Sequence, residues 1–464
     1  MRLYDSMTQE KRDFVPRDED HVTMYFCGPT VYNYVHVGNA RPYVVSLVAK
    51  RYFESLGYKV TLVENITDID DRIIQKAIAE GRTAREVADE FAQAYREDTD
   101  KLGLGRPDVE PLATEHIQEI VALIARLVAE GHAYQSGSDV YFDVDSFAEY
   151  GKLSKQQVGE MRHAERTDLG EDKVDPLDFA LWKGAKPGEP AWDSPWGQGR
   201  PGWHIECSAM SLKYLGAGFD IHGGGRDLIF PHHENELAQA EGALGESFVR
   251  FWMHNGMLNL RDEKMSKSIG NTLTLRATLE RHRPEVLIAA FLGSHYRSPL
   301  EFSDELLDDT AQQVERLRNV FRRLQDYAPS LGSKGDEKLL GFLAQRRGAF
   351  SAALADDLNT AAALAEVFGL AREVNAALAR GNVSVSTAGQ VRSEMVKMAH
   401  VLGLEAVAAE EDTVPVDVDA MAKERLEARA SRDFARADAL RAQIQARGFE
   451  VRDVTDGYKI VPLG

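Results

Sequence analysis

Four side chains of this sequence have the chemistry and the spacing of a metal site. Cys27 follows the apolar run at 22–26, and Cys207 lies within the stretch GWHIECSAM. His232 and Glu236 are four residues apart, so they face the same way if the segment is helical. Two thiolates, an imidazole and a carboxylate are a plausible zinc set. This set also accounts for both cysteines of the chain.

Spacing leaves two alternatives open at these residues. His233 is three residues from Glu236 and could face the same way, so spacing alone does not choose between His232 and His233. Two thiols far apart in an intracellular chain are also compatible with inert core residues. A disulfide framework is excluded, because the chain has only 2 cysteines.

A second candidate segment, HVGN at 36–39, lies between the predicted strand at 22–26 and an apolar helical pattern at 43–49. A glycine at this turn lets backbone approach a ligand, and the start of the helix offers unpaired N–H groups to phosphate. His36 would supply a further donor. Taken alone, the tetrapeptide also fits an ordinary capped helix start.

A third candidate segment, KMSKS at 264–268, is polar and carries Lys264 and Lys267. Attack of a carboxylate on the α-phosphate of ATP builds negative charge in the transition state, which ammonium groups on a loop would stabilise. Taken alone, this segment also fits a solvated basic turn.

The two phosphate-directed segments in this order resemble the class I aminoacyl-tRNA synthetases, with Asn39 where their HxGH signature has a second histidine. Four longer stretches resemble the cysteinyl-tRNA synthetase family: FCGPTVY at 26–32, NITDIDD at 65–71, GWHIECSAM at 202–210 and DIHGGGRDLIFPHHENE at 220–236. The resemblance spans nearly the whole chain. It implies activation of L-cysteine by ATP with Mg²⁺, and transfer of the cysteinyl group to the 3′ end of tRNA(Cys).

The resemblance also implies roles for individual residues. The zinc ligands are Cys27, Cys207, His232 and Glu236. The cysteine substrate is bound by Gly28, Thr67, Trp203, His222 and Asp227, with Asp227 on its amino group. ATP is bound by Thr30, His36, Gly38, Asn39, Gly223, Gly224, Gly225, Lys264 and Lys267, of which His36, Asn39, Lys264 and Lys267 are catalytic.

Two other functions remain as alternatives. A related ligase joins cysteine to an amino sugar with the same zinc and adenylation sites, but it resembles a shorter chain without an anticodon-reading end. A silent zinc-dependent RNA-binding paralogue would have no need of the lysines, His36 and the four ligand candidates that this sequence retains.

The composition predicts a soluble protein. Of 464 residues, 44% are hydrophobic and 28% charged, and the polar start MRLYDSMTQEKRDF does not have the pattern of a signal peptide. We therefore expect a cytoplasmic location, and the resemblance suggests a monomer. The net charge of -19 argues against a uniformly basic RNA-binding surface and leaves local basic surfaces open.

The order of patterns along the chain predicts a Rossmann-like α/β domain with a parallel sheet, interrupted by an insertion and followed by helices. Strands are expected at 22–26, 58–63, 140–144 and from 219, and helices at 116–130, after Ser303 and across 364–378. The expected parts are residues 1–105 and 199–300 (catalytic domain), 106–198 (insertion), 301–403 (helical bundle), 404–420 (acidic linker) and 421–464 (C-terminal anticodon-binding module). The last part has 9 Lys and Arg against 7 Asp and Glu.

Overall fold

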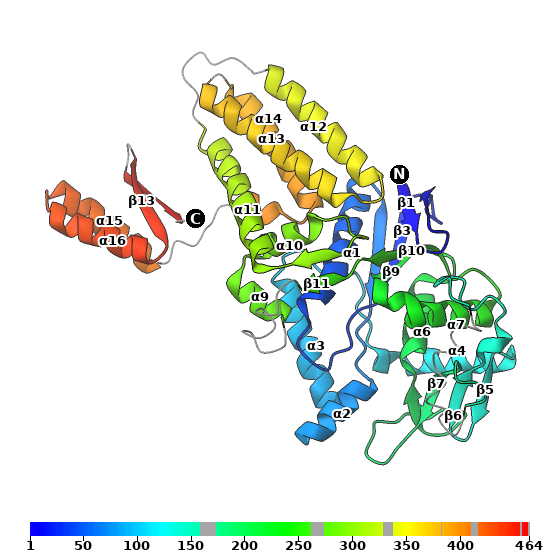
Figure 1. The fold of residues 1–464 in the computed structure, drawn as a ribbon. Helices are drawn as coiled ribbons and strands as arrows, with labels where there is room; N and C mark the ends of the chain where they lie inside the picture. The colour runs from blue at the N-terminus through cyan, green and yellow to red at the C-terminus, as the bar shows by residue number, and fades with distance from the viewer. Residues whose placement is uncertain are drawn as a thin grey trace. The chain divides into compact units, whose positions relative to one another are not determined.

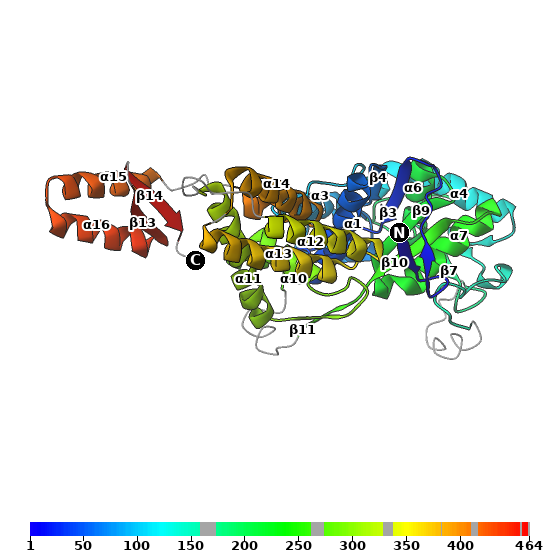
Figure 2. The same ribbon diagram turned by 90° about the horizontal axis from the view of Figure 1, so that it is seen from above.

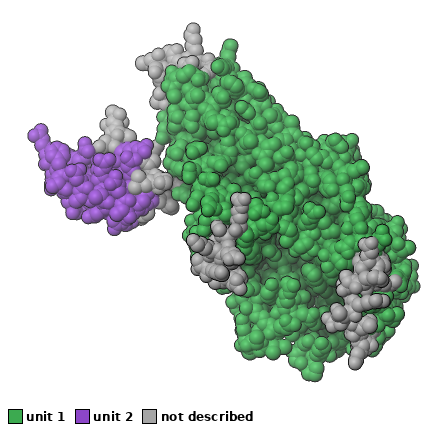
Figure 3. Space-filling view, in the orientation of Figure 1, with its two compact units in different colours: residues 1–406 green, residues 407–464 purple. Residues whose placement is uncertain are grey.

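The computed structural model describes seven stretches of the chain (Figure 1): residues 1–157, 173–260, 273–327, 337–381, 383–409, 416–454 and 457–462. They belong to two units, residues 1–406 and residues 407–464 (Figure 3).

Four parallel strands form the sheet that positions the candidate site. They are β3 (His21–Phe26), β4 (Lys59–Glu64), β9 (Phe219–Gly225) and β10 (Val249–Asn255), in the order β10-β9-β3-β4. Phe26 lies opposite both Glu64 and Gly223. The carboxyl ends of the strands therefore meet at one edge, where open α/β sheets bind their ligands. The predicted parallel sheet is confirmed.

Three helices connect or precede these strands: α1 (Val37–Ser55), α6 (Trp203–Leu215) and α7 (Glu234–Leu244). Figures 1 and 2 show α1 on one face of the sheet and α6 with α7 on the other. Helix α1 begins six residues before the expected apolar pattern, because His36 caps it by accepting a hydrogen bond from the backbone of Gly38. Pro42 is the sixth residue of this helix, so its missing N–H removes one intrahelical hydrogen bond, the one to the carbonyl of Gly38.

The insertion between β4 and β9 contains its own antiparallel sheet, β5 (Ala133–Ser136), β6 (Asp139–Phe142), β7 (Phe179–Gly184) and β8 (Gly199–Pro201), beside helix α4 (Ile117–Ala129). The expected helix and strand are both present. The insertion shares one apolar core with Ile205 and Ala209 of α6 and Ala238 of α7. Its packing therefore helps to hold the two helices that carry Cys207 and Glu236.

The remaining elements of the first unit flank the sheet or follow it. Before and beside the sheet lie β1 (Arg2–Asp5), β2 (Glu10–Asp13), α2 (Asp71–Glu80), α3 (Ala84–Asp100), β11 (Leu258–Leu260), α9 (Leu275–Arg281), α10 (Pro284–Leu292) and β12 (Leu300–Phe302). The helical bundle consists of α11 (Asp304–Gln325), α12 (Glu337–Ala355), α13 (Thr360–Arg380) and α14 (Val385–Val401). Ser303 caps α11 as predicted, by accepting from the backbone of Leu306.

The second unit pairs helices α15 (Val416–Ala430) and α16 (Phe434–Ala446) with the hairpin β13 (Phe449–Val454) and β14 (Gly457–Pro462). Its small core is formed by Val418, Ala422, Ile444 and Val451. Helix α15 begins inside the stretch 404–420 that the acidic composition marked as a linker. The buried Val418 explains the difference, because it gives this acidic stretch an apolar face to pack.

Candidate active site with a metal-ligand cluster

The two cysteines meet at the carboxyl end of the sheet. Cys27 follows β3, and its backbone N–H donates to the carbonyl of Gly223 on the neighbouring strand at 3.1 Å. Cys207 comes from the middle of α6 and is 1% exposed. Both face the first turn of α7, which brings Glu236 to them. Residues more than 200 positions apart in the sequence thus reach one point.

The ligand atoms of Cys27, Cys207, His232 and Glu236 all lie within 4.8 Å of one another. Cys27 Sγ is 3.3 Å from Glu236 Oε1 and 3.5 Å from His232 Nε2, and His232 Nε2 is 3.0 Å from the same oxygen. Zinc takes two sulfurs, a nitrogen and an oxygen at bond lengths of about 2.0–2.3 Å, which requires donors roughly this close. The four residues therefore fit a zinc ion.

The electrostatics of this cluster favour a cation. Burial raises the pKa of the Cys27 thiol well above its usual range, and Cys207 and Glu236 raise it further. Burial by itself would lower the pKa of His232, but the Glu236 carboxylate and Cys207 together raise that pKa to about 10. Without a metal, the buried carboxylate thus keeps a proton on the imidazole. A bound cation would take over that role and also favour thiolates.

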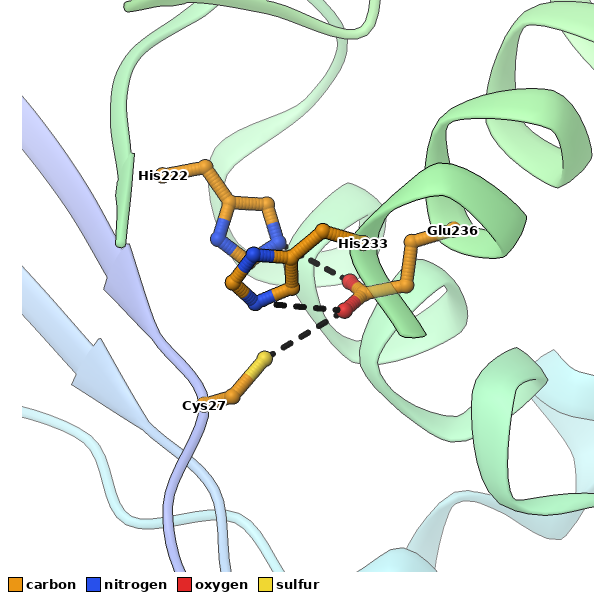
Figure 4. Close-up of side chains that lie close together, drawn as sticks. All are labelled: Cys27, His222, His233 and Glu236. Atoms are coloured by element: carbon orange, nitrogen blue, oxygen red, sulfur yellow. Dashed lines mark hydrogen bonds and ion pairs between the residues drawn. The ribbon is translucent and has the colours of Figure 1, made fainter. Parts of the chain in front are cut away.

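A second set of ligand atoms shares two residues with the first. Cys27, His222, His233 and Glu236 also lie within 4.8 Å of one another, and Figure 4 shows their side chains converging. His222 Nε2 is 2.9 Å from Glu236 Oε2, and His233 Nε2 is 3.9 Å from Glu236 Oε1. The structure therefore brings both His232 and His233 to the cluster, and the choice that spacing left open remains open in the geometry.

Further histidines orient these rings from behind. His204 Nδ1 lies 2.9 Å from His232 Nδ1, and His254 Nε2 lies 2.8 Å from His233 Nδ1. Hydrogen bonds to the far nitrogen of a ring are typical of metal-ligating histidines, because they fix its tautomer and orientation. His204 and His254 had no role in the sequence prediction, and the structure gives them this one.

The predicted cysteine-binding residues occupy different positions around the cluster. Trp203, 37% exposed, stacks on His232 with ring centroids 4.3 Å apart, so it covers the accessible side. Asp227 is exposed in the short helix Arg226–Leu228. Thr67 is buried and donates to Glu206 Oε2 at 3.0 Å. His222 has no exposed surface, and its Nε2 lies 2.9 Å from Glu236 Oε2.

The glycines near the site are required by packing. A Cβ on Gly28 would lie 1.8 Å from the carbonyl oxygen of Asn65. At Gly223 it would lie 2.4 Å from the Phe26 ring, and at Gly224 3.1 Å from His233. At Gly225 it would meet the Asp227 carboxylate at 2.3 Å. These glycines therefore let the strands, His233 and Asp227 approach closely, whatever contact they also make with a nucleotide.

The HVGN segment forms the start of α1 beside the same edge of the sheet. His36 Nδ1 accepts from the backbone N–H of Gly38 at 3.0 Å, and burial lowers the pKa of the ring. A neutral ring whose Nδ1 accepts carries its proton on Nε2, which is then a donor. Asn39 is exposed in the first turn, and Thr30 pairs with Thr67 through their backbones.

The KMSKS segment at 264–268 lies outside the described residues, which end at 260 and resume at 273. The roles expected for Lys264 and Lys267 therefore stay predictions.

Comparisons with known proteins identify the family. Residues 13–312 match the tRNA synthetases class I (C) catalytic domain, and residues 349–406 match the DALR domain. A cysteine–tRNA ligase of Caldicellulosiruptor saccharolyticus is 44% identical over 463 residues, covering 99% of both chains. One of Bacillus cereus (strain AH187) is 44% identical over 461 residues, again covering 99% of both. The chain belongs to the cysteine–tRNA ligase family.

Solved structures agree with this family in fold. The methionyl-tRNA synthetase of Mycobacterium tuberculosis in complex with methionyl-adenylate has a TM-score of 0.60 at 16% identity, covering 83% of this chain and 90% of that one. A LeuRS–tRNA–LeuAMS complex of Agrobacterium radiobacter K84 has a TM-score of 0.61 at 10% identity, covering 86% of each chain. The class I synthetase fold expected from the sequence is confirmed. Within the described residues, no helix is long and apolar enough to cross a membrane.

Two polar residues of this cysteine–tRNA ligase site were missed by the sequence reasoning. Asn65 accepts from the backbone of Gly28 at 3.1 Å and donates to Thr67 Oγ1 at 3.3 Å. Glu206 is fully buried and accepts from Thr67, while its Oε1 has no hydrogen-bond partner. One signal was present in the sequence: Glu206 is a charged residue beside Cys207 in a helix with few other charges. Buried polar groups in such a position usually serve a site.

Proposed function

We propose that this enzyme activates L-cysteine with ATP to cysteinyl adenylate and transfers the cysteinyl group to the 3′ end of tRNA(Cys). The observation that carries the proposal is the gathering of Cys27, Cys207, His232 and Glu236 at the carboxyl edge of a class I synthetase sheet. Cysteine–tRNA ligases match 99% of the chain, including the second unit, which favours tRNA over an amino sugar as the acceptor.

The four cluster residues would hold one zinc ion, and Mg²⁺ would accompany ATP. Zinc bound there supplies a preference for a thiolate over a hydroxyl, which shape alone does not provide, because a pocket separates near-isosteres by only about 10²-fold. Trp203 supports this arrangement, since it lines the accessible side of His232.

Other residues would bind and orient the reactants. Asp227 would pair with the amino group of cysteine, and Thr67, held by Glu206, would line the pocket. The start of α1, with Gly38 and Asn39, would face the phosphates, and His36 would donate from Nε2. Such donors are most effective when they are fixed before the charge develops.

The lysines complete the proposed site. Lys264 and Lys267 would stabilise the negative charge on the α-phosphate as the cysteine carboxylate attacks. We further propose that the enzyme acts as a cytoplasmic monomer, on the strength of the family resemblance.

Aminoacylation of unfractionated tRNA with each amino acid in turn tests the proposed function directly. We expect charging with cysteine only, together with cysteine-dependent exchange of pyrophosphate into ATP. Exchange without charging would indicate a different acceptor for the activated cysteine. Neither exchange nor charging, from a folded protein that binds metal, would contradict the proposal.

Cobalt substitution tests the metal assignment separately. Cobalt bound by thiolates gives an intense charge-transfer band, and we expect added cysteine to strengthen it and serine to leave it unchanged. A band that ignores cysteine would indicate a closed structural site, for which four protein ligands suffice.

A further inference from the structure

We propose that the cluster contains two mutually exclusive positions for one metal ion, and that Cys207 keeps the ion in the one that substrate can reach. The outer position is formed by Cys27, Cys207, His232 and Glu236. The inner position is formed by Cys27, His222, His233 and Glu236. This inference rests on the proposed zinc-dependent function.

The inner set has the ligand chemistry of a zinc site. One thiol, two imidazoles and a carboxylate are all common zinc ligands, and their atoms lie within 4.8 Å of one another. Figure 4 shows the side chains of Cys27, His222 and His233 directed at the Glu236 carboxylate. Its Oε2 faces His222 at 2.9 Å, while its Oε1 faces Cys27 at 3.3 Å.

An unpartnered nitrogen provides an independent observation. His233 has no exposed surface, yet its Nε2, which lies 3.9 Å from Glu236 Oε1, has no hydrogen-bond partner. Buried polar atoms without partners are rare, because each costs about 1–3 kcal/mol. His233 Nε2 is turned toward the cluster because His254 holds Nδ1 from behind, and Ser6 Oγ holds His254 at 2.7 Å. This is the arrangement of a ligating histidine.

The two positions exclude one another and differ in access. Both need Cys27 and Glu236, so a single ion occupies one or the other. Each position has four protein ligands, of which three are buried, so ligand burial does not separate the two. The histidines of the inner position pack on Trp252, which is only 1% exposed. The outer position adjoins the half-exposed Trp203, from where cysteine can approach. An ion in the outer position can therefore bind the substrate thiol, whereas an ion in the inner position cannot.

The number of thiolates decides between the positions. The outer set has two and the inner set has one, and zinc prefers thiolate among the available ligands. The wild-type ion is therefore expected in the outer position. Removal of Cys207 leaves the inner set complete and the outer set with three ligands, so the ion should move inward and not be lost.

The test uses the full-length Cys207→Ser variant loaded with cobalt, with bound metal measured by elemental analysis. We expect one cobalt ion per chain, a charge-transfer band of about half the wild-type intensity because one thiolate ligates in place of two, and no response to cysteine. Two further variants made in this background locate the ion. His233→Gln should release it, and the matched His232→Gln should retain it.

The opposite pattern, in which His232→Gln releases the ion and His233→Gln retains it, would overturn the proposal. So would a folded Cys207→Ser protein that binds no metal. If Cys207→Ser does not fold, His232→Gln in the otherwise native chain tests the same point. A move inward predicts a one-thiolate band, whereas an undiminished two-thiolate band would contradict the proposal. None of these readouts depends on charging of tRNA, so failure of the proposed function would be seen separately.

Discussion

Both units of this chain have apolar cores, but they differ in the polar side chains that they bury. Residues 1–406 bury His222, His233 and Glu236 at the carboxyl edge of a parallel sheet. In residues 407–464, the described side chains form an apolar cluster around Val418, Ala422, Ile444 and Val451, and Arg425 is buried as well. Buried polar groups that satisfy one another form a rigid, preorganised site, whereas a small apolar core serves to hold a surface in place.

The surface of the second unit carries an aromatic ring and several guanidinium groups. Phe434 is 60% exposed, and Arg429 on α15, Arg436 on α16 and Arg432 between the two helices are exposed. Cations that neutralise phosphates and aromatic rings that stack on bases are the usual means of binding single-stranded RNA. We therefore predict that the second unit contacts tRNA, while the first unit carries the metal-ligand cluster.

The largest effect should come from Lys267→Ala, because it removes charge stabilisation from the chemical step. We expect cysteine-dependent pyrophosphate exchange and tRNA charging to fall together, by roughly 10²- to 10³-fold, with cysteine binding nearly unchanged. Rapid-quench measurement of adenylate formation checks this. Adenylate formed at the wild-type rate would remove Lys267 from the site.

Deletion of residues 407–464 should separate the two activities. The first unit keeps its sheet, cluster and bundle, so pyrophosphate exchange should stay within about 2-fold of the intact chain, whereas loss of phosphate contacts should reduce kcat/KM for tRNA by at least about 10-fold. Unchanged charging by a folded truncated protein would show that the second unit does not contact tRNA.

Ile444→Ala should unfold the second unit without shortening the chain, and so should have the same effect as its deletion. Ile444 is fully buried in a cluster of four buried side chains. Truncation of a buried Ile to Ala reduces the free energy of unfolding by about 2–5 kcal/mol. So small a core has little stability to spare. We expect the second unit to unfold at a lower temperature while the main unfolding transition of the first is unchanged. Leu426→Ala, a partly exposed position on α15, is the matched control. A single shifted transition would mean that the units unfold together.

The sequence predicted the parts of this site that depend on residue type and local periodicity. The strand at 22–26 and the capping role of Ser303 could be stated from the residues alone. The choice of the outer ligand set came from the family resemblance, and the structure brings that set together. Spacing could not separate His232 from His233, because the irregular turn Ile229–His233 precedes α7 and brings both rings to Glu236.

Contacts between segments that are distant in the sequence could not be predicted from periodicity. The position of His222 on β9 places its Nε2 2.9 Å from Glu236 Oε2 and its ring against Trp252, contacts that the sequence could not indicate. Its role at the substrate stays a prediction. The sequence did not indicate roles for Glu206 and Asn65, because their hydrogen-bond partners lie in other segments of the chain. Glu206 accepts from Thr67, and Asn65 accepts from the backbone of Gly28. Contacts of this kind depend on the assembled fold.

The smallest expected effect concerns Glu64, a buried carboxylate of the first unit that has no buried counterpart among the described carboxylates of the second. Glu64 ends β4, is 4% exposed, and accepts a hydrogen bond from Tyr95. Burial raises its pKa to about 8; the Tyr95 hydrogen bond lowers it and Glu110 raises it. In the unfolded chain its pKa returns to about 4.3. Between these values the folded protein binds more protons than the unfolded one. The contribution of Glu64 to the free energy of unfolding is therefore present at low pH. It is lost as pH rises toward 8, at about 1.4 kcal/mol per pH unit.

Glu64→Gln keeps an acceptor for Tyr95 and removes the titration. Urea unfolding at pH 6, 7 and 8 should show the free energy of unfolding of the wild type falling relative to that of the variant as pH rises. Histidines titrate equally in both proteins, so the difference between the two isolates Glu64. The transition of the second unit should be the same in both proteins at every pH, because the side chains described there include no buried carboxylate. Parallel pH profiles for the two proteins would show that Glu64 is ionised in the fold, and that the first unit tolerates a buried charge at the end of β4 as readily as it does at its metal cluster.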